Sequence, residues 1–167
     1  KGCTNLYDGL IMGLNSVNKC INLNDNINTI YCFTDGVANK NPPSGVIPSL
    51  TSHINSLDNN ENTSIHLFGF GKNLESNLLN EIALLGNESF HYIPDVSFIG
   101  TIFCNSIANT KAICATNVFL NIELCNNAIL DNSILLGNIS YNKFSWGIQI
   151  PINSMIYDQH RNFIIKF

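Results

Sequence analysis

The first 110 residues alternate between two kinds of hydrophobic pattern. Between residues 5 and 20, apolar side chains recur every three to four positions, which is the spacing of a helix. One face of this predicted helix would carry Leu6, Leu10, Leu14 and Val17. The segment NTIYCFT at 28–34 is instead a short continuous apolar run, typical of a strand buried on both faces of a parallel sheet. The same patterns predict further helices at 46–57, 75–86 and 96–110, and further strands at 64–71 and 89–95.

This order of elements predicts an α/β fold with a mostly parallel sheet and flanking helices, since parallel strands need crossover connections. Local signals support the helix boundaries. Thr4 or Asn5 can cap the first helix, Asp8 lies in its first turn, and Gly86 ends the third predicted helix.

The pattern changes near residue 111. From Asn117 to Leu124 the chain alternates, with an apolar set at Val118, Leu120, Ile122 and Leu124. This period of two indicates a half-buried strand. Further short strands are expected in NSILLGNIS, FSWGIQIPI and RNFIIKF, with Phe144 and Trp146 in the core of a sandwich. We therefore predict two parts, an α/β part over 1–110 and an antiparallel, all-β part over 111–167.

Composition narrows the class of protein. Of the 167 residues, 45% are hydrophobic and 12% charged, which indicates a globular chain with enough apolar surface for a core. A net charge of −4 argues against a nucleic-acid binder. The absence of an apolar run of 18 residues argues against a membrane span.

Six cysteines lie at positions 3, 20, 32, 104, 114 and 125, and none forms a CxxC pair, which argues against a structural zinc site. Small buried thiols in a reducing, cytoplasmic or otherwise intracellular location are the favoured interpretation, Cys104 among them. A disulfide framework is the alternative. The four histidines, at 53, 66, 91 and 160, lack metal spacing and are interpreted as structural or surface residues.

The acid that ends the run 28–34 has two interpretations. Asp35 precedes a glycine, and an Asp-Gly pair by itself is more typical of a turn. If 28–34 is a parallel strand, however, Asp35 lies at its carboxyl end, where α/β sheets bind ligands. Thr4 has a similar ambiguity, because a helix cap is the ordinary role of a threonine at that position.

The segments GCTNLYDGLIMGL, IYCFTDGVAN and IHLFGFG together resemble the von Willebrand factor A family. The resemblance implies a protein-binding module with a metal-ion-dependent adhesion site, in which Mg²⁺ or Mn²⁺ is bound at the end of the sheet. Thr4 then matches the threonine of the second metal loop, and Asp35 the aspartate of the third. Hydroxyl and carboxylate oxygens are suitable ligands for such a hard cation, and a carboxylate of a protein partner can complete its coordination.

A longer stretch resembles A domains that are fused to hedgehog/intein-like (Hint) domains, often with U-box or other ubiquitin-pathway modules. Its most specific part is IPDxxxxGTxFxxxxAN, with Ile93, Pro94, Asp95, Gly100, Thr101, Phe103, Ala108 and Asn109 in place. A turn containing Gln159, Arg161 and Asn162 extends the likeness. The resemblance implies that 1–110 is the C-terminal part of an A domain, and that 111–167 belongs to the region between it and a Hint domain.

Two departures limit what the resemblance implies. The DxSxS motif that supplies the main metal ligands is missing, so we expect an incomplete site that binds magnesium weakly. The family places that motif on a central strand before the start of this sequence. Without this neighbour, strand 28–34 is expected to be an exposed edge through which the chain self-associates. The catalytic residues of a Hint domain would follow Phe167, so no catalytic residue is assigned and we expect this segment not to be an enzyme.

Three functions remain open. The segment is a protein-binding module, or a scaffold within a larger ubiquitin-ligase or autoprocessing protein, or a degenerate fragment that binds nothing.

Overall fold

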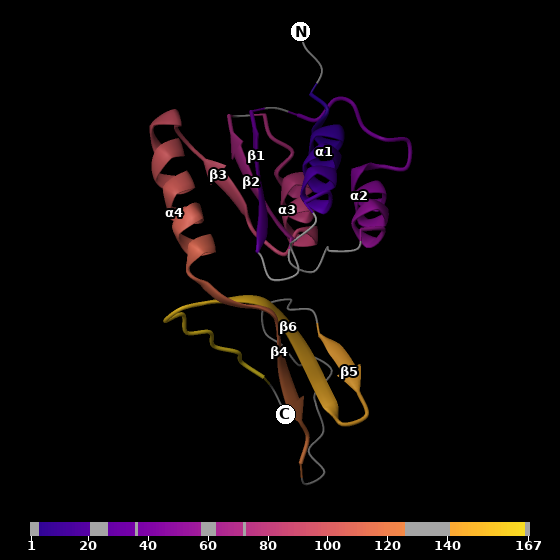
Figure 1. Ribbon diagram of the computed structural model, residues 1–167, viewed down its shortest axis with the longest axis vertical. Coiled ribbons are helices and arrows are strands. Elements are labelled where there is room, and N and C mark those ends of the chain that lie inside the picture. The colour runs from indigo at the N-terminus through magenta and orange to yellow at the C-terminus, as the bar shows by residue number, and fades with distance from the viewer. Residues whose placement is uncertain are drawn as a thin grey trace. The chain divides into compact units, whose positions relative to one another are not determined.

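Three parallel strands form the centre of the first part of the molecule (Figure 1). They are β1 (Asn28–Thr34), β2 (Thr63–Phe70) and β3 (Phe90–Ile93), in the spatial order β1-β2-β3. Strand β1 pairs with β2 from Asn28 opposite Thr63 to Thr34 opposite Gly69. The computed structural model describes residues 4–20, 27–35, 37–57, 63–71, 73–125 and 141–165. It divides the chain into two compact units, 1–108 and 109–167. The parallel sheet that the helix-strand alternation predicts is confirmed.

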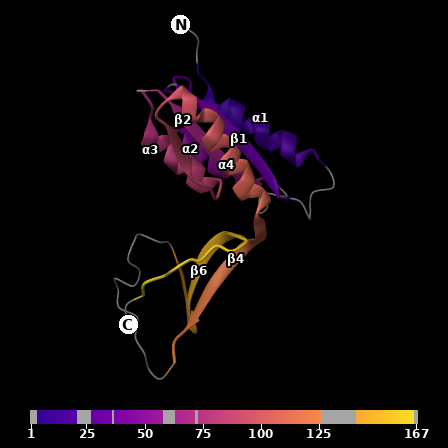
Figure 2. The ribbon, with the colours of Figure 1, turned by 90° about the vertical axis from the view of Figure 1, so that its left-hand side faces the viewer.

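Helices cover both faces of this sheet. On one face lie α1 (Leu6–Asn18), α2 (Val46–Asn55) and α3 (Ser76–Leu85). A short 3₁₀ turn, η2 (Val96–Phe98), leads into α4 (Ile99–Lys111), which covers the other face. Figure 1 shows the strands between α4 and the other helices, and Figure 2 looks onto the sheet across α4.

The ends of these helices follow local chemistry. The side chain of Asn5 caps α1 by accepting a hydrogen bond from the backbone of Asp8, so Asn5 and not Thr4 is the cap. Gly86 ends α3 as predicted, and its backbone carbonyl also accepts a hydrogen bond from the backbone of Ile65 at 3.0 Å. A side chain at 86 would not fit, because its Cβ would lie only 2.4 Å from the Cβ of Ile65.

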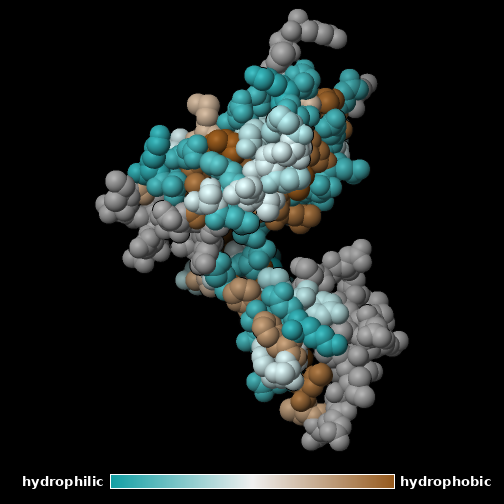
Figure 3. All heavy atoms as spheres, turned by 90° about the vertical axis from the view of Figure 1, so that its right-hand side faces the viewer, coloured by the Kyte–Doolittle hydropathy of each residue, from teal (hydrophilic) through white to brown (hydrophobic). Residues whose placement is uncertain are grey.

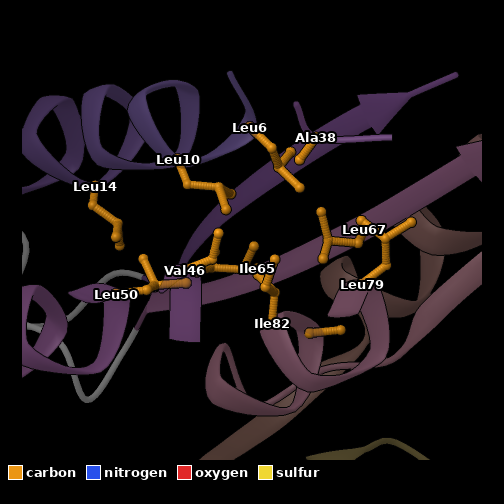
Figure 4. Close-up of a cluster of buried hydrophobic side chains, with 11 residues drawn as sticks. Leu6, Leu10, Leu14, Ala38, Val46, Leu50, Ile65, Leu67, Leu79 and Ile82 are labelled. Carbon is orange, nitrogen blue, oxygen red and sulfur yellow. The ribbon is translucent and has the colours of Figure 1, made fainter. Parts of the chain in front are cut away.

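The main core fills the space between β2 and the three helices on its face (Figure 4). Helix α1 contributes the leucines that its spacing predicts, and the other elements present aliphatic side chains to them. The buried set is Leu6, Leu10, Leu14, Ala38, Val46, Leu50, Ile65, Leu67, Leu79, Ile82 and Ala83. The solvent side of α1 and α2 is mainly hydrophilic (Figure 3), as amphipathic helices on a core require.

The other face of the sheet carries a layer of rings beneath α4. Phe68 of β2 stacks on Phe33 of β1, with ring centroids 4.7 Å apart, and on His91 of β3 at 5.1 Å. From α4, Phe103 meets the rings of Tyr31 and Phe33 edge-on, at 5.3 and 5.4 Å. Offset stacked and edge-on contacts are the favourable geometries for such rings.

The prediction that 28–34 is buried on both faces was wrong. Five consecutive residues of β1, Asn28 to Cys32, are only half-buried, and Phe33 is 41% exposed. The buried strand is β2, which lies between two others. Among the described strands β1 lies at the end of the sheet, which agrees with the exposed edge expected from the family resemblance and not with the burial expected from the apolar run alone. Self-association through this edge stays a prediction.

The second unit is an antiparallel sheet of β4 (Ile113–Glu123), β5 (Asn142–Phe144) and β6 (Gly147–Ile156), in the order β4-β6-β5. The alternation predicted from 117 to 124 is confirmed, since the apolar set is half-buried and the residues between are exposed. Ile148 and Ile150 are buried against Leu120 and Ile122 on one side of the sheet. The strand expected in NSILLGNIS lies outside the described residues.

Phe144 and Trp146 were expected in the core, and that expectation was wrong. Their side chains are 44% and 38% exposed, and their rings stack on one another with centroids 5.1 Å apart. Phe144 ends β5 and Trp146 lies in the tight turn that leads to β6, where side chains extend beyond the sheet.

Arg161 holds the chain after β6 against that strand. Its guanidinium donates hydrogen bonds to the carbonyl oxygens of Ile152 and Ser154, at 3.0 and 2.9 Å, and to Gln159 at 3.4 Å. The Gln-x-Arg turn therefore has a structural role, because one planar guanidinium bonds two carbonyls of the same strand.

The close approach of Gly86 to Ile65 gives a stability prediction. Gly86→Ala should lower the free energy of unfolding by about 2 kcal/mol, because the new Cβ forces α3 away from β2. Gly9→Ala is the matched control, since Gly9 lies within α1 and a Cβ there meets nothing within 4 Å. The free energy of unfolding of that variant should rise by about 0.5–1 kcal/mol. Urea unfolding followed by circular dichroism measures both, and equal effects would contradict the packing described.

Candidate functional site

The loops at the carboxyl end of the parallel sheet contain both residues that the sequence predicts as metal ligands. Thr4 immediately precedes the cap of α1, and its backbone is bonded to the loop after β1. Its N–H donates to Oδ1 of Asn39 at 2.9 Å, and its carbonyl accepts from the N–H groups of Asn39 and Lys40 at 3.1 and 3.4 Å. The start of α1 is thus held to the loop that begins with Asp35.

Asp35 is exposed and is the first residue after β1. Its carbonyl oxygen faces Gly71, the first residue after β2, where a Cβ would lie 3.3 Å away. Gly71 also has a φ of 107°, which only glycine adopts without strain. The loops after β1 and β2 therefore approach one another closely at Asp35 and Gly71, while the backbone of Thr4 is bonded to Asn39.

The donors present fit a divalent cation in kind but not in number. A hard cation such as Mg²⁺ prefers six oxygen ligands, and Thr4 and Asp35 offer one hydroxyl and one carboxylate. Within the ranges that the structure describes, no group of three or more His, Cys, Asp or Glu side chains is arranged to hold a metal ion. A cation held by these two side chains would keep most of its water ligands.

A shallow pocket of about 150 Å³ lies beside Thr4, at the start of α1. Its lining includes the opposite charges of Asp8 and Lys40, and the complete set is Asn5, Tyr7, Asp8, Lys40, Asn41 and Pro42. Its size suits one side chain of a partner better than a cofactor, since cofactor pockets are several times larger.

Exposed apolar side chains also follow the strands at this end. Val37 lies after β1, and Val96 and Phe98 lie after β3 in η2, all of them substantially exposed. Apolar and aromatic residues among polar loops are typical of the core of a protein interface.

The family-like stretch from Ile93 to Asn109 has a clear structural role here. Ile93 is fully buried at the end of β3, and Asp95 caps η2 by accepting a hydrogen bond from the backbone of Ser97 at 2.8 Å. Hydrogen bonds from Ser97 hold the pKa of Asp95 below its ordinary value. Phe103 then packs α4 onto the ring layer. These residues therefore direct the chain from β3 into α4.

Sequence reasoning missed a polar cluster that is largely buried beneath α4. His66 of β2 is only 5% exposed, with Nδ1 3.3 Å from the hydroxyl of Ser106 on α4 and Nε2 3.6 Å from a carboxylate oxygen of Glu88. Burial, and secondarily the charge of His91, lowers the pKa of His66 to about 4, while burial lowers the pKa of His91. The order Glu-His-Ser is that of a catalytic triad, but Ser106 is itself buried and offers no hydroxyl to a substrate.

This pairing gives almost no sequence signal, because Ser106 is 40 residues from His66. The alternation of side chains along β2 gives a partial sequence signal for the position of His66. Ile65 and Leu67 point to the main core, so His66 and Phe68 between them must face the other side.

The cysteine interpretation needs correction. Cys20, Cys104, Cys114 and Cys125 are exposed thiols, and Cys104 lies on the outer side of α4 and not in a core. Only Cys32 is partly buried among the described cysteines, and burial raises its pKa to about 11. Cys3 lies outside the described residues.

Comparison with known proteins bears on the fold. Neither a protein-family model nor a curated protein sequence matches the chain. A solved structure titled "von Willebrand factor type A from Catenulispora acidiphila" superimposes with a TM-score of 0.62 over 93% of this chain. The fold is von Willebrand factor A-like. Sequence identity to that structure is 14%, so the likeness concerns the fold alone, and the match covers 36% of that longer chain.

This comparison confirms the predicted fold class. The link to Hint domains and the ubiquitin pathway stays a prediction, because no relative in sequence supports it. Among the described residues, no helix is both long and apolar enough to cross a membrane.

The environment of His66 predicts a pH dependence. Its pKa is about 4 in the folded protein and near the ordinary 6.5 when unfolded, so the unfolded chain binds the extra proton between these values. Stability should therefore be fully present above pH 6.5 and fall by at most about 3 kcal/mol as the pH drops to 4. Every α-helix that the structure describes lies before residue 112, so helical circular dichroism reports on this region.

His66→Gln should flatten that profile, and His160→Gln, at an exposed position, should leave it unchanged. Urea midpoints measured from pH 4 to 8 provide the comparison. A profile that keeps its full slope in His66→Gln would show that another group causes it.

Proposed function

We propose that this chain is a protein-recognition module that binds its partner at the carboxyl end of the parallel sheet. The observation that carries the proposal is the A-like fold, with 93% of the chain matched at a TM-score of 0.62. Loops at that end of a parallel sheet are free to vary, because strands and helices supply most of the core.

Three features of this end support a protein as the ligand. Val37, Val96 and Phe98 present apolar surface, and the neighbouring pocket offers both a carboxylate and an ammonium group. The net charge of −4 disfavours nucleic acid.

We further propose that Thr4 and Asp35 are two oxygen ligands of a divalent cation, Mg²⁺ or Mn²⁺. When bound, the cation would supply a positive charge that accepts a carboxylate of the partner. The backbone of Thr4 is fixed through Asn39, so its hydroxyl needs little ordering, whereas Asp35 is on an exposed loop. With so few protein ligands, we expect millimolar or weaker affinity.

The metal assignment is tested by calorimetric titration of Mn²⁺ and Mg²⁺ into the wild-type chain, Asp35→Asn and Asp158→Asn. Both variants remove one exposed carboxylate, but Asp158 lies in the second unit at a φ of 62°, which asparagine tolerates well. The wild-type chain and Asp158→Asn should bind the cation weakly and with equal affinity. Asp35→Asn should bind it at least fivefold more weakly. Equal affinities in all three would eliminate Asp35 as a ligand.

Recognition itself is tested by panning a displayed random-peptide library on the same proteins, with Mg²⁺ and with EDTA. We expect peptides containing an acidic residue to be enriched by the wild-type chain in Mg²⁺ and lost with Asp35→Asn. Enrichment that persists in EDTA would show that peptide binding does not require the cation. No enrichment under either condition would favour the degenerate, non-binding alternative.

The domain assignment follows from the same proposal. Residues 1–110 would be the C-terminal part of an A domain, and 111–167 the region that leads to a Hint domain. As a scaffold in an autoprocessing or ubiquitin-ligase protein, the segment would be flanked by a DxSxS motif upstream and a Hint or U-box domain downstream. The adjoining coding sequence tests this directly, and self-cleavage of the longer product would support the scaffold.

A further inference from the structure

The pocket at the start of α1 contains two opposite charges that do not neutralise one another. The carboxylate of Asp8 and the ammonium of Lys40 both line its space of about 150 Å³. In the part of the chain that the structure describes, no ion pair joins these two groups. Each charge therefore keeps its capacity to bind a group that enters the pocket.

Both charged residues are positioned by the two residues that precede α1. The side chain of Asn5 donates a hydrogen bond to one carboxylate oxygen of Asp8 and accepts one from the backbone N–H of Asp8. The backbone N–H of Lys40 donates to the carbonyl oxygen of Thr4 at 3.4 Å. The carboxylate is thus held directly, whereas the lysine is held by its backbone and its long side chain can adjust to a ligand.

The two charges together decide which kind of side chain suits the pocket. An acidic side chain would be attracted by Lys40 and repelled by Asp8, and a basic side chain would meet the reverse. A carboxamide avoids this conflict, because its carbonyl oxygen accepts hydrogen bonds and its NH₂ group donates them. It can accept from the ammonium of Lys40 and donate to the other carboxylate oxygen of Asp8. Both bonds involve a charged group, which makes them stronger than bonds between neutral groups.

We propose that this pocket binds the carboxamide side chain of an asparagine or glutamine. The proposal rests on the proposed recognition function, to which it adds a second contact in which an amide residue of the partner enters beside Thr4. The pocket has room for one such side chain, and the apolar parts of Tyr7 and Pro42 on its wall can pack against the methylene groups. The cation proposed at Thr4 and Asp35 is not required, because neither charge of the pocket belongs to its ligands.

Chemical shifts in ¹H–¹⁵N NMR spectra test this assignment. The probes are the N-acetyl, N-methylamide derivatives of glutamine, glutamate, lysine and alanine, each titrated with EDTA present. The alanine probe reports binding of the probe backbone alone. In the wild-type chain, the backbone amides of Asp8 and Lys40 should shift most with the glutamine probe. Its Kd should be about threefold lower than that of either charged probe, a modest factor because exposed charges interact weakly in water.

Removing one charge should change the preference in a defined direction. Lys40→Gln leaves the carboxylate unopposed and should favour the lysine probe, whereas Asp8→Asn leaves the ammonium unopposed and should favour the glutamate probe. Lys19→Gln and Asp158→Asn are the matched controls, because they remove exposed charges at the other end of α1 and in the second unit. Both controls should keep the preference for glutamine.

Helical circular dichroism establishes that each variant is folded. Shifts that are absent or equal for all four probes overturn the assignment, and so does a glutamine preference that both Lys40→Gln and Asp8→Asn retain. The peptide library judges the recognition function separately. Enriched peptides that lack asparagine and glutamine would contradict the amide contact alone. A glutamine probe that binds while the library yields no peptide would contradict the recognition function alone.

Discussion

The structure of the first unit depends on the burial of β2 from both sides. Ile65 and Leu67 point into the aliphatic core under α1, α2 and α3, and His66 and Phe68 point into the ring layer under α4. Each helix is amphipathic, so it is stable only with its apolar face on this sheet. The fit at β2 is close, as the contact of Gly86 with Ile65 shows. Removing β2 would remove the central surface on which α3 and α4 pack from opposite faces.

The same arrangement determines where function can reside. Parallel strands direct their carboxyl ends to one side, so the loops after β1, β2 and β3 meet there with the start of α1. Asp35 and Gly71 approach one another for this reason, and Thr4 is bonded to Asn39 in the loop after β1. The two outer strands of the sheet differ from one another. Strand β3 is followed directly by a proline, and β1, the other outer strand among those that the structure describes, contains no charged residue.

Much of the fold could be predicted because its signals are local. The leucine spacing of α1, the cap at Asn5, the stop at Gly86 and the alternation through β4 each depend on residues within one or two turns or strands. The errors share a different cause. From its apolar run β1 was expected to be buried on both faces, Cys104 to lie in a core and Trp146 to fill a sandwich. Instead β1 is half-buried, and Cys104 and Trp146 are exposed. Hydrophobicity alone indicates that a residue can be buried, and a partner from elsewhere in the chain decides whether it is.

By itself, the sequence determined the type and order of the elements, the α/β character of the first unit, and the candidates Thr4 and Asp35 at the ends that such a fold exposes. Only the tertiary structure decided that Thr4 is tied to Asn39 and that Asp35 faces Gly71. It alone placed His66 between Glu88 and Ser106 and left most of β1 only half-buried. The physical reason is that helix and strand periodicity come from neighbouring residues, whereas burial, pKa shifts and free edges come from contacts between residues far apart in the chain.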